Sequence, residues 1–340
     1  MNKIETKSYL SQVRQLRKFA ISAVKMYPID IIQLKFINHG ENTTYKIISK
    51  QGNFLLRIHR QNNHSKNAIL EELGWVKHLS ESTDYIQQPI PSINGLLVEE
   101  ITISNTLDSR FCSVLKWVDG NLRYRSLTQN SMFNTGKLVG TLHKNAFKQK
   151  VLYRNYWDSE GLLGKNATFG SLHNLKPEIR KREYEILEKC RKITFKKIEN
   201  YIIKNPHKSS MIHADLHIGN IVWKKDKPIP IDFDDCGFGS HMYDLAVILK
   251  GSDNLFKSSQ KKAKKPFVES LLEGYSSTQN LSKDDIDILP YFKITRNLLM
   301  LGWEYERRDN PSIFKYFIKY FEYHIKNFEK VLKNGPDSLY

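Results

Sequence analysis

The stretch M-I-H-A-D-L-H-I-G-N, residues 211–220, decides how the rest of this 340-residue sequence is interpreted. From His213 onward it has the form H-x-D-L-x-x-x-N, which places Asn220 five positions after Asp215. An apolar run then ends at Asp232, and the pattern predicts a β-hairpin with strands at residues 220–223 and 228–231. The three oxygen-bearing side chains are therefore expected to converge on one point.

This spacing matches the catalytic loop of protein kinases. In that loop the aspartate accepts the proton of the attacking hydroxyl, and the asparagine holds a magnesium ion. We therefore interpret Asp215 as the catalytic base, and Asn220 and Asp232 as metal ligands. Phosphoryl transfer asks a protein for little covalent chemistry, so it needs mainly a positioned hydroxyl and oxygen-bound cations that neutralise phosphate charge.

Two further segments, I-D-F-D-D-C-G-F-G at residues 231–239 and Y-D-L-A at residues 243–246, complete a resemblance to the aminoglycoside phosphotransferase family. This protein-kinase-like group also holds choline, homoserine and methylthioribose kinases and a bacterial stress-response Ser/Thr kinase. The resemblance implies transfer from ATP, with Mg²⁺, to a hydroxyl. It also implies an α+β bilobal fold, with a small antiparallel-sheet N-lobe and a larger, mainly helical C-lobe, and an Asp244 that braces the catalytic loop from a helix N-cap.

Residues 1–119 are expected to form an N-terminal helix and the nucleotide-binding N-lobe. The helix is predicted at residues 1–26, and strands at 32–38, 44–49 and 53–58. The turn G-E-N-T-T at residues 40–44 has one glycine and also fits an ordinary hairpin. The resemblance implies that Asn42 and Thr43 offer N–H and hydroxyl groups to the phosphates of ATP.

Arg57 lies in the third predicted strand, where protein kinases place the lysine that binds phosphate. Arginine stays charged and can fork onto phosphate oxygens, so the substitution preserves the chemistry, although an exposed strand arginine is the alternative. Glu72, in the helix that follows, is the expected ion-pair partner of Arg57. Its neighbour Glu71 would face another side of the helix and is the second choice.

Two strands are predicted at residues 96–103 and 110–118. At the end of the second, backbone groups of Lys116 and Val118 are expected to meet the adenine edge. From Thr128 the pattern is helical, so residues 120–340 are assigned to the C-lobe, which would carry the catalytic, metal and acceptor sites. Helices are predicted at residues 132–143, 177–203, 263–275, 283–301 and 311–332, with an irregular insertion at 151–175.

The acceptor is expected to be a small molecule with a hydroxyl, such as an aminoglycoside, amino alcohol, homoserine or sugar. A short segment of eleven residues separates Asp232 from Asp244, too few for a regulated activation segment. A protein Ser/Thr kinase of the bacterial stress-response type remains the alternative. The acceptor pocket is predicted to have at its rim Tyr156, Trp157, Asp234, Trp303, Glu304 and Arg307. Aromatic residues at helical spacing are, however, more often core than ligand contacts.

Composition is that of an ordinary globular protein, with 40% hydrophobic and 26% charged residues. The formal charge of +17, with a dense run from Lys257 to Lys265, indicates a solvated lysine surface more than a specific nucleic-acid site. A non-catalytic basic binding protein is the distant alternative. Three separated cysteines, no signal-peptide core and no apolar run of membrane length favour a cytoplasmic address. The chain is expected to be a monomer or homodimer without a specific nucleic-acid partner.

Overall fold

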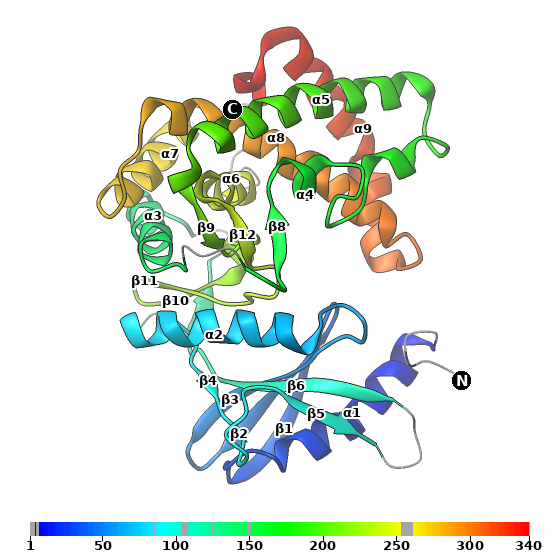
Figure 1. The fold of residues 1–340 in the computed structure, drawn as a ribbon, viewed down its shortest axis with the longest axis vertical. Helices are drawn as coiled ribbons and strands as arrows, with labels where there is room; N and C mark the ends of the chain where they lie inside the picture. The colour runs from blue at the N-terminus through cyan, green and yellow to red at the C-terminus, as the bar shows by residue number, and fades with distance from the viewer. Residues whose placement is uncertain are drawn as a thin grey trace. The chain divides into compact units, whose positions relative to one another are not determined.

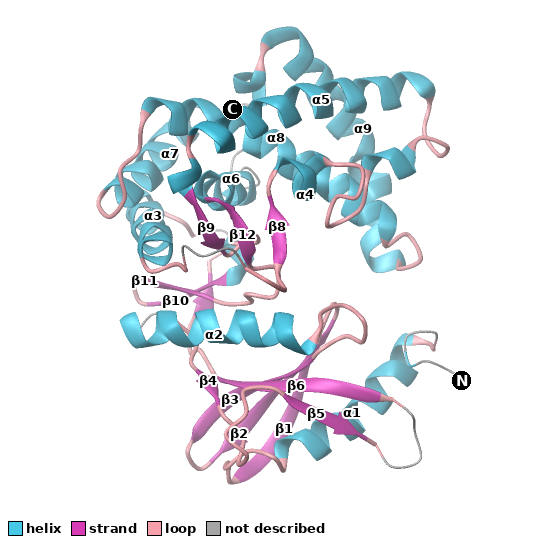
Figure 2. Ribbon diagram, in the orientation of Figure 1, coloured by secondary structure: helices cyan, strands magenta, loops and turns pink. Residues whose placement is uncertain are grey.

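The computed structural model describes residues 4, 7–83, 86–103, 108–123, 126–147, 151–252 and 261–339. The chain divides into two compact units: residues 1–120 with Ile229–Asp234, and Asn121–Pro228 with Asp235–Tyr340. The expected single boundary after residue 119 did not include the return of residues 229–234 to the first unit. Strands dominate the first unit and helices the second (Figure 2), so the predicted α+β class is confirmed.

The first unit is built on an antiparallel sheet in which consecutive strands β1, β2 and β3 are neighbours. Strand β6 adds to β3 and also pairs with β4 and β5. The first three strands coincide with the three predicted at residues 32–38, 44–49 and 53–58, and the predicted strand at residues 96–103 shortens to β5. The bounds are β1 (Ile31–His39), β2 (Thr43–Ser49), β3 (Gly52–Ile58), β4 (Pro89–Ile90), β5 (Glu99–Thr102) and β6 (Ser109–Lys116).

Helix α1 (Tyr9–Val24) covers the apolar side chains of this sheet (Figure 1). Its buried Phe19 and Ala23 belong to one core cluster with Leu56 and Val114 of the sheet. The predicted helix at residues 1–26 therefore begins at Tyr9, and most of residues 1–6 lie outside the described residues. Helix α2 (Lys66–Ser82) starts at a Ser65 cap that accepts a hydrogen bond from the N–H of Ala68.

The second unit is mainly helical, and the helices predicted at 132–143, 177–203, 263–275, 283–301 and 311–332 are present. Helices α3 and α7 can approach closely because Gly136 has no side chain. A Cβ added there would lie only 1.9 Å from the carbonyl oxygen of Leu271. The bounds are α3 (Gln129–Lys144), α4 (Ser159–Leu163), α5 (Lys181–Lys204), α6 (His241–Ser252), α7 (Lys261–Ser276), α8 (Lys283–Glu306) and α9 (Pro311–Asn334).

The insertion at residues 151–175 is more regular than predicted. Strand β8 (Asn155–Trp157) pairs in parallel with β12 (Gly237–Ser240), which pairs antiparallel with β9 (Ser209–Ile212). The prediction failed because a three-residue strand is stabilised by a distant partner and has no local pattern of its own. Close pairing requires glycine in β12, since a Cβ at Gly237 would lie 2.3 Å from the carbonyl oxygen of Asn155.

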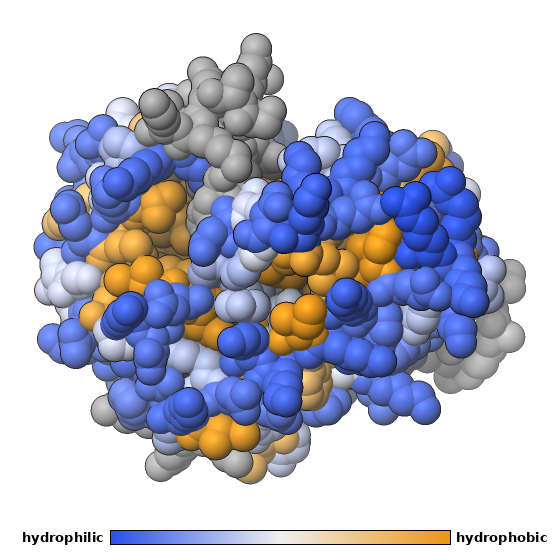
Figure 3. All heavy atoms as spheres, turned by 90° about the horizontal axis from the view of Figure 1, so that it is seen from above, coloured by the Kyte–Doolittle hydropathy of each residue, from blue (hydrophilic) through white to orange (hydrophobic). Residues whose placement is uncertain are grey.

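The predicted hairpin after Asn220 is present as β10 (Ile221–Lys224) and β11 (Lys227–Pro230), with β7 (Asn121–Leu122) beside β10. No helix among the described residues is long and apolar enough to cross a membrane. Hydrophilic side chains cover most of the face drawn in Figure 3, with apolar residues in separate patches. Lys257 of the predicted basic run lies outside the described residues.

Candidate active site

The loop that carries Asp215 leaves β9 and is fixed by a buried carboxylate. Asp244 accepts hydrogen bonds from the backbone N–H of Ala214 (2.7 Å) and of His213 (3.0 Å). It also contacts Nε2 of the buried His143 at 3.1 Å. Burial alone would raise the pKa of Asp244, but the His143 contact and these N–H groups hold its pKa below the ordinary value. The Asp244 carboxylate is therefore charged, and three neighbouring groups hydrogen-bond to it.

The predicted bracing role of Asp244 agrees with this geometry, but the predicted N-cap position is wrong. Asp244 is the fourth residue of α6, which begins at His241. At the start of that helix, the N–H of Met242 donates to the hydroxyl of Ser240 (3.4 Å). The side chain of Asp244 is instead directed to the loop, because its carboxylate bonds the loop backbone rather than its own helix.

Four described non-glycine residues have left-handed backbone angles, and two of them, Ala214 and Asp232, lie in the motif segments. Ala214 has φ +64° and Asp232 has φ +63°. For residues with a Cβ this conformation costs about 1–2 kcal/mol, and it persists only where surrounding contacts fix it. At Ala214 the bond from its N–H to Asp244 supplies that contact. Strained residues concentrate at functional sites, which agrees with the interpretation of both segments.

Asp215 and Asn220 contact each other as the motif predicts. The amide Nδ2 of Asn220 donates to the carbonyl oxygen of Asp215 (3.0 Å) and to its Oδ2 (3.2 Å). The amide oxygen of Asn220 therefore faces away from these two acceptors and can serve as a ligand to a cation. His217 approaches the same Oδ2 through Nε2 at 3.6 Å.

His217 is neutral in this setting. Burial lowers the pKa of its imidazole, against the opposing charge of Asp215. Its Nδ1 accepts the N–H of Gly219 at 2.9 Å. The proton of the neutral ring is consequently on Nε2, the nitrogen nearer Asp215.

Arg296 is the site residue that the sequence analysis missed. It lies in α8, and its Nη2 donates to Oδ1 of Asp215. Its Nη1 donates to the hydroxyl of Tyr243 at 3.4 Å. Burial alone would lower the pKa of Arg296, but the charge of Asp215 raises it above its ordinary value. A weak signal existed, because Arg296 is a charged residue between the apolar Ile294 and Leu298 of a predicted helix.

In the first unit Arg57 forms the predicted pair with Glu72, at 2.5 Å between Nη2 and Oε1. Both side chains are nearly inaccessible to solvent. The geometry thus chooses Glu72 over Glu71 as the partner. Burial alone would lower the pKa of Arg57, but the charges of Glu72 and Asp234 keep it above the ordinary value.

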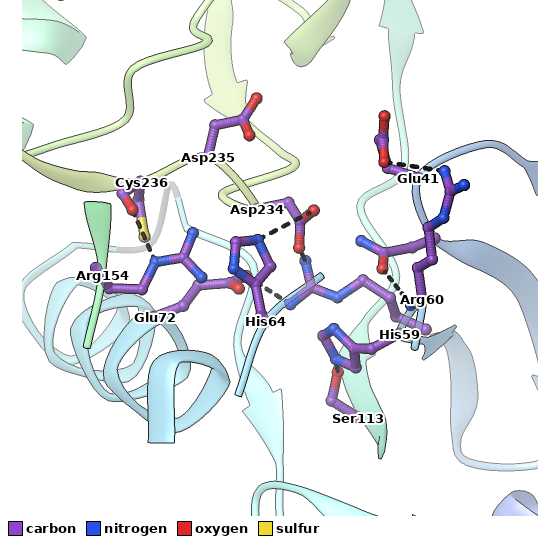
Figure 4. A network of polar contacts seen from close by, with 12 residues as sticks. Glu41, His59, Arg60, His64, Glu72, Ser113, Arg154, Asp234, Asp235 and Cys236 are labelled. Carbon is purple, nitrogen blue, oxygen red and sulfur yellow. Dashed lines mark hydrogen bonds and ion pairs between the residues drawn. The ribbon is translucent and has the colours of Figure 1, made fainter. Parts of the chain in front are cut away.

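Asp234 adds a second carboxylate beside the guanidinium of Arg57. It lies 3.7 Å from Nη1 of Arg57 and 3.8 Å from Nε2 of His64 (Figure 4). The expected place of Asp234 on an acceptor rim is not supported, because the residue is buried and groups with the first unit. Asp232 is exposed, and its charge also raises the pKa of Arg57.

The two predicted phosphate-facing turn residues are tied to the sheet. Asn42 accepts a hydrogen bond on Oδ1 from the N–H of Arg60 (3.3 Å). Thr43 is buried, and its hydroxyl lies 2.7 Å from Nδ1 of His39. Phosphate contact by the Thr43 hydroxyl would require this bond to open, so backbone N–H groups are the better-placed donors of the turn.

At the end of β6, the N–H of Lys116 donates to the carbonyl of Gln88 (2.8 Å). Its carbonyl accepts from Nε2 of Gln87 (3.0 Å) and retains a second lone pair. A contact to adenine would therefore use the carbonyl of Lys116 and the backbone of Val118, which is half-buried. Trp117, between them, packs under Nζ of Lys46 at 4.1 Å from the ring centroid.

The predicted acceptor rim separates into core and candidate residues. Trp157 is core: it is fully buried and stacks on Tyr243 with ring centroids 6.0 Å apart. Trp303 lies under the guanidinium of Arg307 at 4.7 Å. Glu304 differs from these, because its Oε2 is buried and has no hydrogen-bond partner within the described ranges. Burial raises the pKa of Glu304 to about 7.

A kinase-like fold with an aspartate–asparagine catalytic loop defines the chain as a phosphotransferase of the protein-kinase-like class. The Phosphotransferase enzyme family model matches residues 33–281, and the chain belongs to this family. Within the described part of the chain, no group of three or more His, Cys, Asp or Glu side chains could hold a metal ion. That is compatible with Mg²⁺ in nucleotide enzymes, which takes one or two protein carboxylates plus phosphate oxygens.

Known relatives include kinases of different acceptors. Amicoumacin kinase of Bacillus subtilis (strain 168) is 24% identical over 303 residues, covering 86% of this chain and 85% of the relative. Stress response kinase A of Escherichia coli (strain K12) is 23% identical, covering 83% and 80%. A microcompartment-associated aminopropanol kinase superposes with TM-score 0.79 at 25% identity, covering 94% and 98%. An amicoumacin kinase in complex with AMP-PNP, Ca²⁺ and Ami gives TM-score 0.70 at 20% identity, covering 92% and 93%.

Proposed function

We propose that this phosphotransferase moves the γ-phosphoryl group of ATP, with Mg²⁺, to a hydroxyl of a small molecule that carries an amino group. The observation that carries the proposal is the catalytic loop. Its Asp215 carboxylate is held by Asn220 and Arg296, while its backbone is held by Asp244. A loop of this spacing and rigidity is suited to position a hydroxyl and accept its proton.

In the proposed reaction Asp215 accepts the proton of the acceptor hydroxyl. The acceptor oxygen forms a bond to the γ-phosphorus, and the bond from that phosphorus to the β–γ bridging oxygen breaks. The electron pair of the broken bond leaves with ADP. Because the transition state is loose, proton transfer is late, and positioning of the hydroxyl contributes more than strong basicity.

Asn220 and Asp232 are the proposed oxygen ligands for Mg²⁺, which neutralises phosphate charge when bound. The amide of Asn220 fits, because its nitrogen is used by Asp215 and its oxygen is not. The exposed carboxylate of Asp232 also fits. Arg57, steadied by Glu72, is the proposed phosphate anchor, and Asn42, Thr43, Lys116 and Val118 are the remaining nucleotide contacts that we propose.

The role of Asp232 gives a direct prediction. Asp232→Asn should raise the Kd of Mg-ATP by about tenfold or more, because a charged ligand becomes neutral. Nucleotide affinity in EDTA should change little. Isothermal titration calorimetry with and without Mg²⁺ measures both, and Asp226→Asn, on the β10–β11 turn, is the matched surface control. An unchanged Mg-ATP affinity would remove Asp232 from the metal site.

Glu304 supports an amine on the acceptor. A buried carboxylate oxygen without a donor is costly, and a bound ammonium group would supply one. Glu304 follows Arg296 by eight helical residues, which is about 12 Å along the axis. This separation favours an acceptor longer than a two- or three-carbon amino alcohol.

The pKa of Glu304 near 7 makes the amine contact pH-dependent. Below that value the carboxyl is protonated and loses its attraction for an ammonium group, so the KM for the acceptor should rise as pH falls from 8 to 6. Glu304→Gln should raise the KM about tenfold at pH 8 and flatten this pH dependence. Steady-state kinetics from pH 6 to 8 measure it, and Glu306→Gln, on the exposed side of α8, is the control. A Glu304→Gln enzyme with the wild-type profile would contradict the proposal.

The function itself is tested by incubating the chain with γ-labelled ATP, Mg²⁺ and a panel of aminoglycosides, short amino alcohols and deaminated analogues. Label is expected in amine-bearing hydroxyl compounds. The similarity to stress response kinase A favours a second candidate, a protein Ser/Thr kinase. A cell lysate in the same assay separates the two, because label confined to protein bands supports the second candidate and overturns the first.

A further inference from the structure

The pair formed by Arg296 and Asp215 joins residues that are 81 positions apart in the chain. The guanidinium of Arg296 is 9% exposed and the carboxylate of Asp215 is 19% exposed. An arginine buried to this extent would carry a large desolvation cost without a charged partner. The pair is therefore a largely buried ion pair within the helical unit and not an incidental surface contact.

The contacts divide the two carboxylate oxygens of Asp215 between different neighbours. Oδ1 accepts from Arg296, whereas Oδ2 faces Nδ2 of Asn220 and Nε2 of His217. A carboxylate that is free to rotate about its Cβ–Cγ bond could present either oxygen. Because Oδ1 is bonded to the buried guanidinium of Arg296, the orientation of the carboxylate plane is fixed. Oδ2 therefore lies on the side of the proposed metal ligand Asn220.

Arg296 is itself held by a second contact. Its other terminal nitrogen donates to the hydroxyl of Tyr243, the residue next to Asp244. Tyr243 is fully buried and stacks on Trp157. The planar fork of arginine can bond Oδ1 of Asp215 and the hydroxyl of Tyr243 at the same time, which a lysine ammonium on a flexible stem does less well. The adjacent residues Tyr243 and Asp244 thus support the catalytic loop in two ways. Tyr243 holds Arg296, which bonds the Asp215 carboxylate, and Asp244 bonds the loop backbone.

We propose that Arg296 is the positioning residue of the phosphotransfer, holding Asp215 so that Oδ2 receives the acceptor proton. The inference rests on the proposed function, because it assigns a role within that reaction. The fixed positive charge of Arg296 also offsets the repulsion between the Asp215 carboxylate and the phosphoryl group. That phosphoryl group is the one attacked by the acceptor hydroxyl. Loss of Arg296 should consequently act on the chemical step and leave nucleotide binding intact.

The test uses the slow hydrolysis of Mg-ATP, in which water is the acceptor, so no acceptor needs to be identified. Arg296→Met should lower kcat about 100-fold, with the Kd of Mg-ATP within twofold of wild type. Arg296→Lys should retain part of the activity. Arg191→Met is the control, because Arg191 is also ion-paired and largely buried in the same unit, with Glu188 as its partner. Its kcat should not change.

Two further measurements separate positioning from structural support. Millimolar guanidinium should restore part of the activity of Arg296→Ala and none of that of Asp215→Asn. In single turnovers, the double variant Asp215→Asn/Arg296→Met should be no slower than Asp215→Asn alone, because Arg296 acts through that carboxylate. Multiplicative losses, or an Arg296→Met enzyme with wild-type kcat beside an inactive Asp215→Asn, would overturn the inference. A wild-type chain that neither hydrolyses Mg-ATP nor labels any compound of the acceptor panel would instead overturn the proposed function itself.

Discussion

Asp215→Ala should lower phosphoryl transfer by at least about 10³-fold while Mg-ATP still binds. The variant removes the group that accepts the hydroxyl proton, and general-base catalysis contributes about 10²–10⁴-fold. It also leaves the buried Arg296 without its carboxylate and removes one of the two acceptors of Asn220 Nδ2, whose bond to the backbone carbonyl of residue 215 remains. Positioning is thus lost together with the base.

Single-turnover transfer from labelled ATP measures the loss, and calorimetric titration of Mg-ATP measures the binding that should persist. Asp235→Ala is a neighbouring carboxylate control in the same unit. Turnover by Asp215→Ala within tenfold of wild type would end the assignment of Asp215. A large loss of nucleotide affinity would show that its main role is in binding.

Asp244→Ala should have the largest effect on stability, lowering the free energy of unfolding by about 3–5 kcal/mol. The substitution leaves the N–H groups of His213 and Ala214 and the imidazole of His143 without their acceptor in a buried site. The left-handed backbone of Ala214 also loses the contact that offsets its strain.

Urea denaturation measures this change, and the acid limb of stability provides a second readout. Because the pKa of Asp244 is below its ordinary value in the folded chain, its contribution is present above the unfolded pKa of about 4. It is lost as pH falls through the folded pKa, so wild type and Asp244→Ala should converge in stability in strong acid. A difference under 1 kcal/mol at pH 7 would contradict the bracing role.

Much of the fold follows from local patterns. Strand β2 alternates fully and partly buried side chains, and helices α3 and α5 each bury one face, so each has a period that its own segment reveals. The catalytic loop is similarly local, because Asp215 and Asn220 meet within one turn of chain. The sequence also narrowed the partner of Arg57 to the adjacent Glu71 and Glu72 of α2, and the structure shows that it is Glu72.

The sequence by itself determined the class of fold, the phosphotransferase motif and the pairing of Asp215 with Asn220, because each depends on spacing along the chain. Only the tertiary structure decided that Arg296 holds Asp215, that Asp234 belongs with Arg57, and that Trp157 is core. These contacts join segments far apart in sequence. Neither periodicity nor motif spacing encodes which distant side chains meet, since that choice depends on how the helices and short strands pack around them.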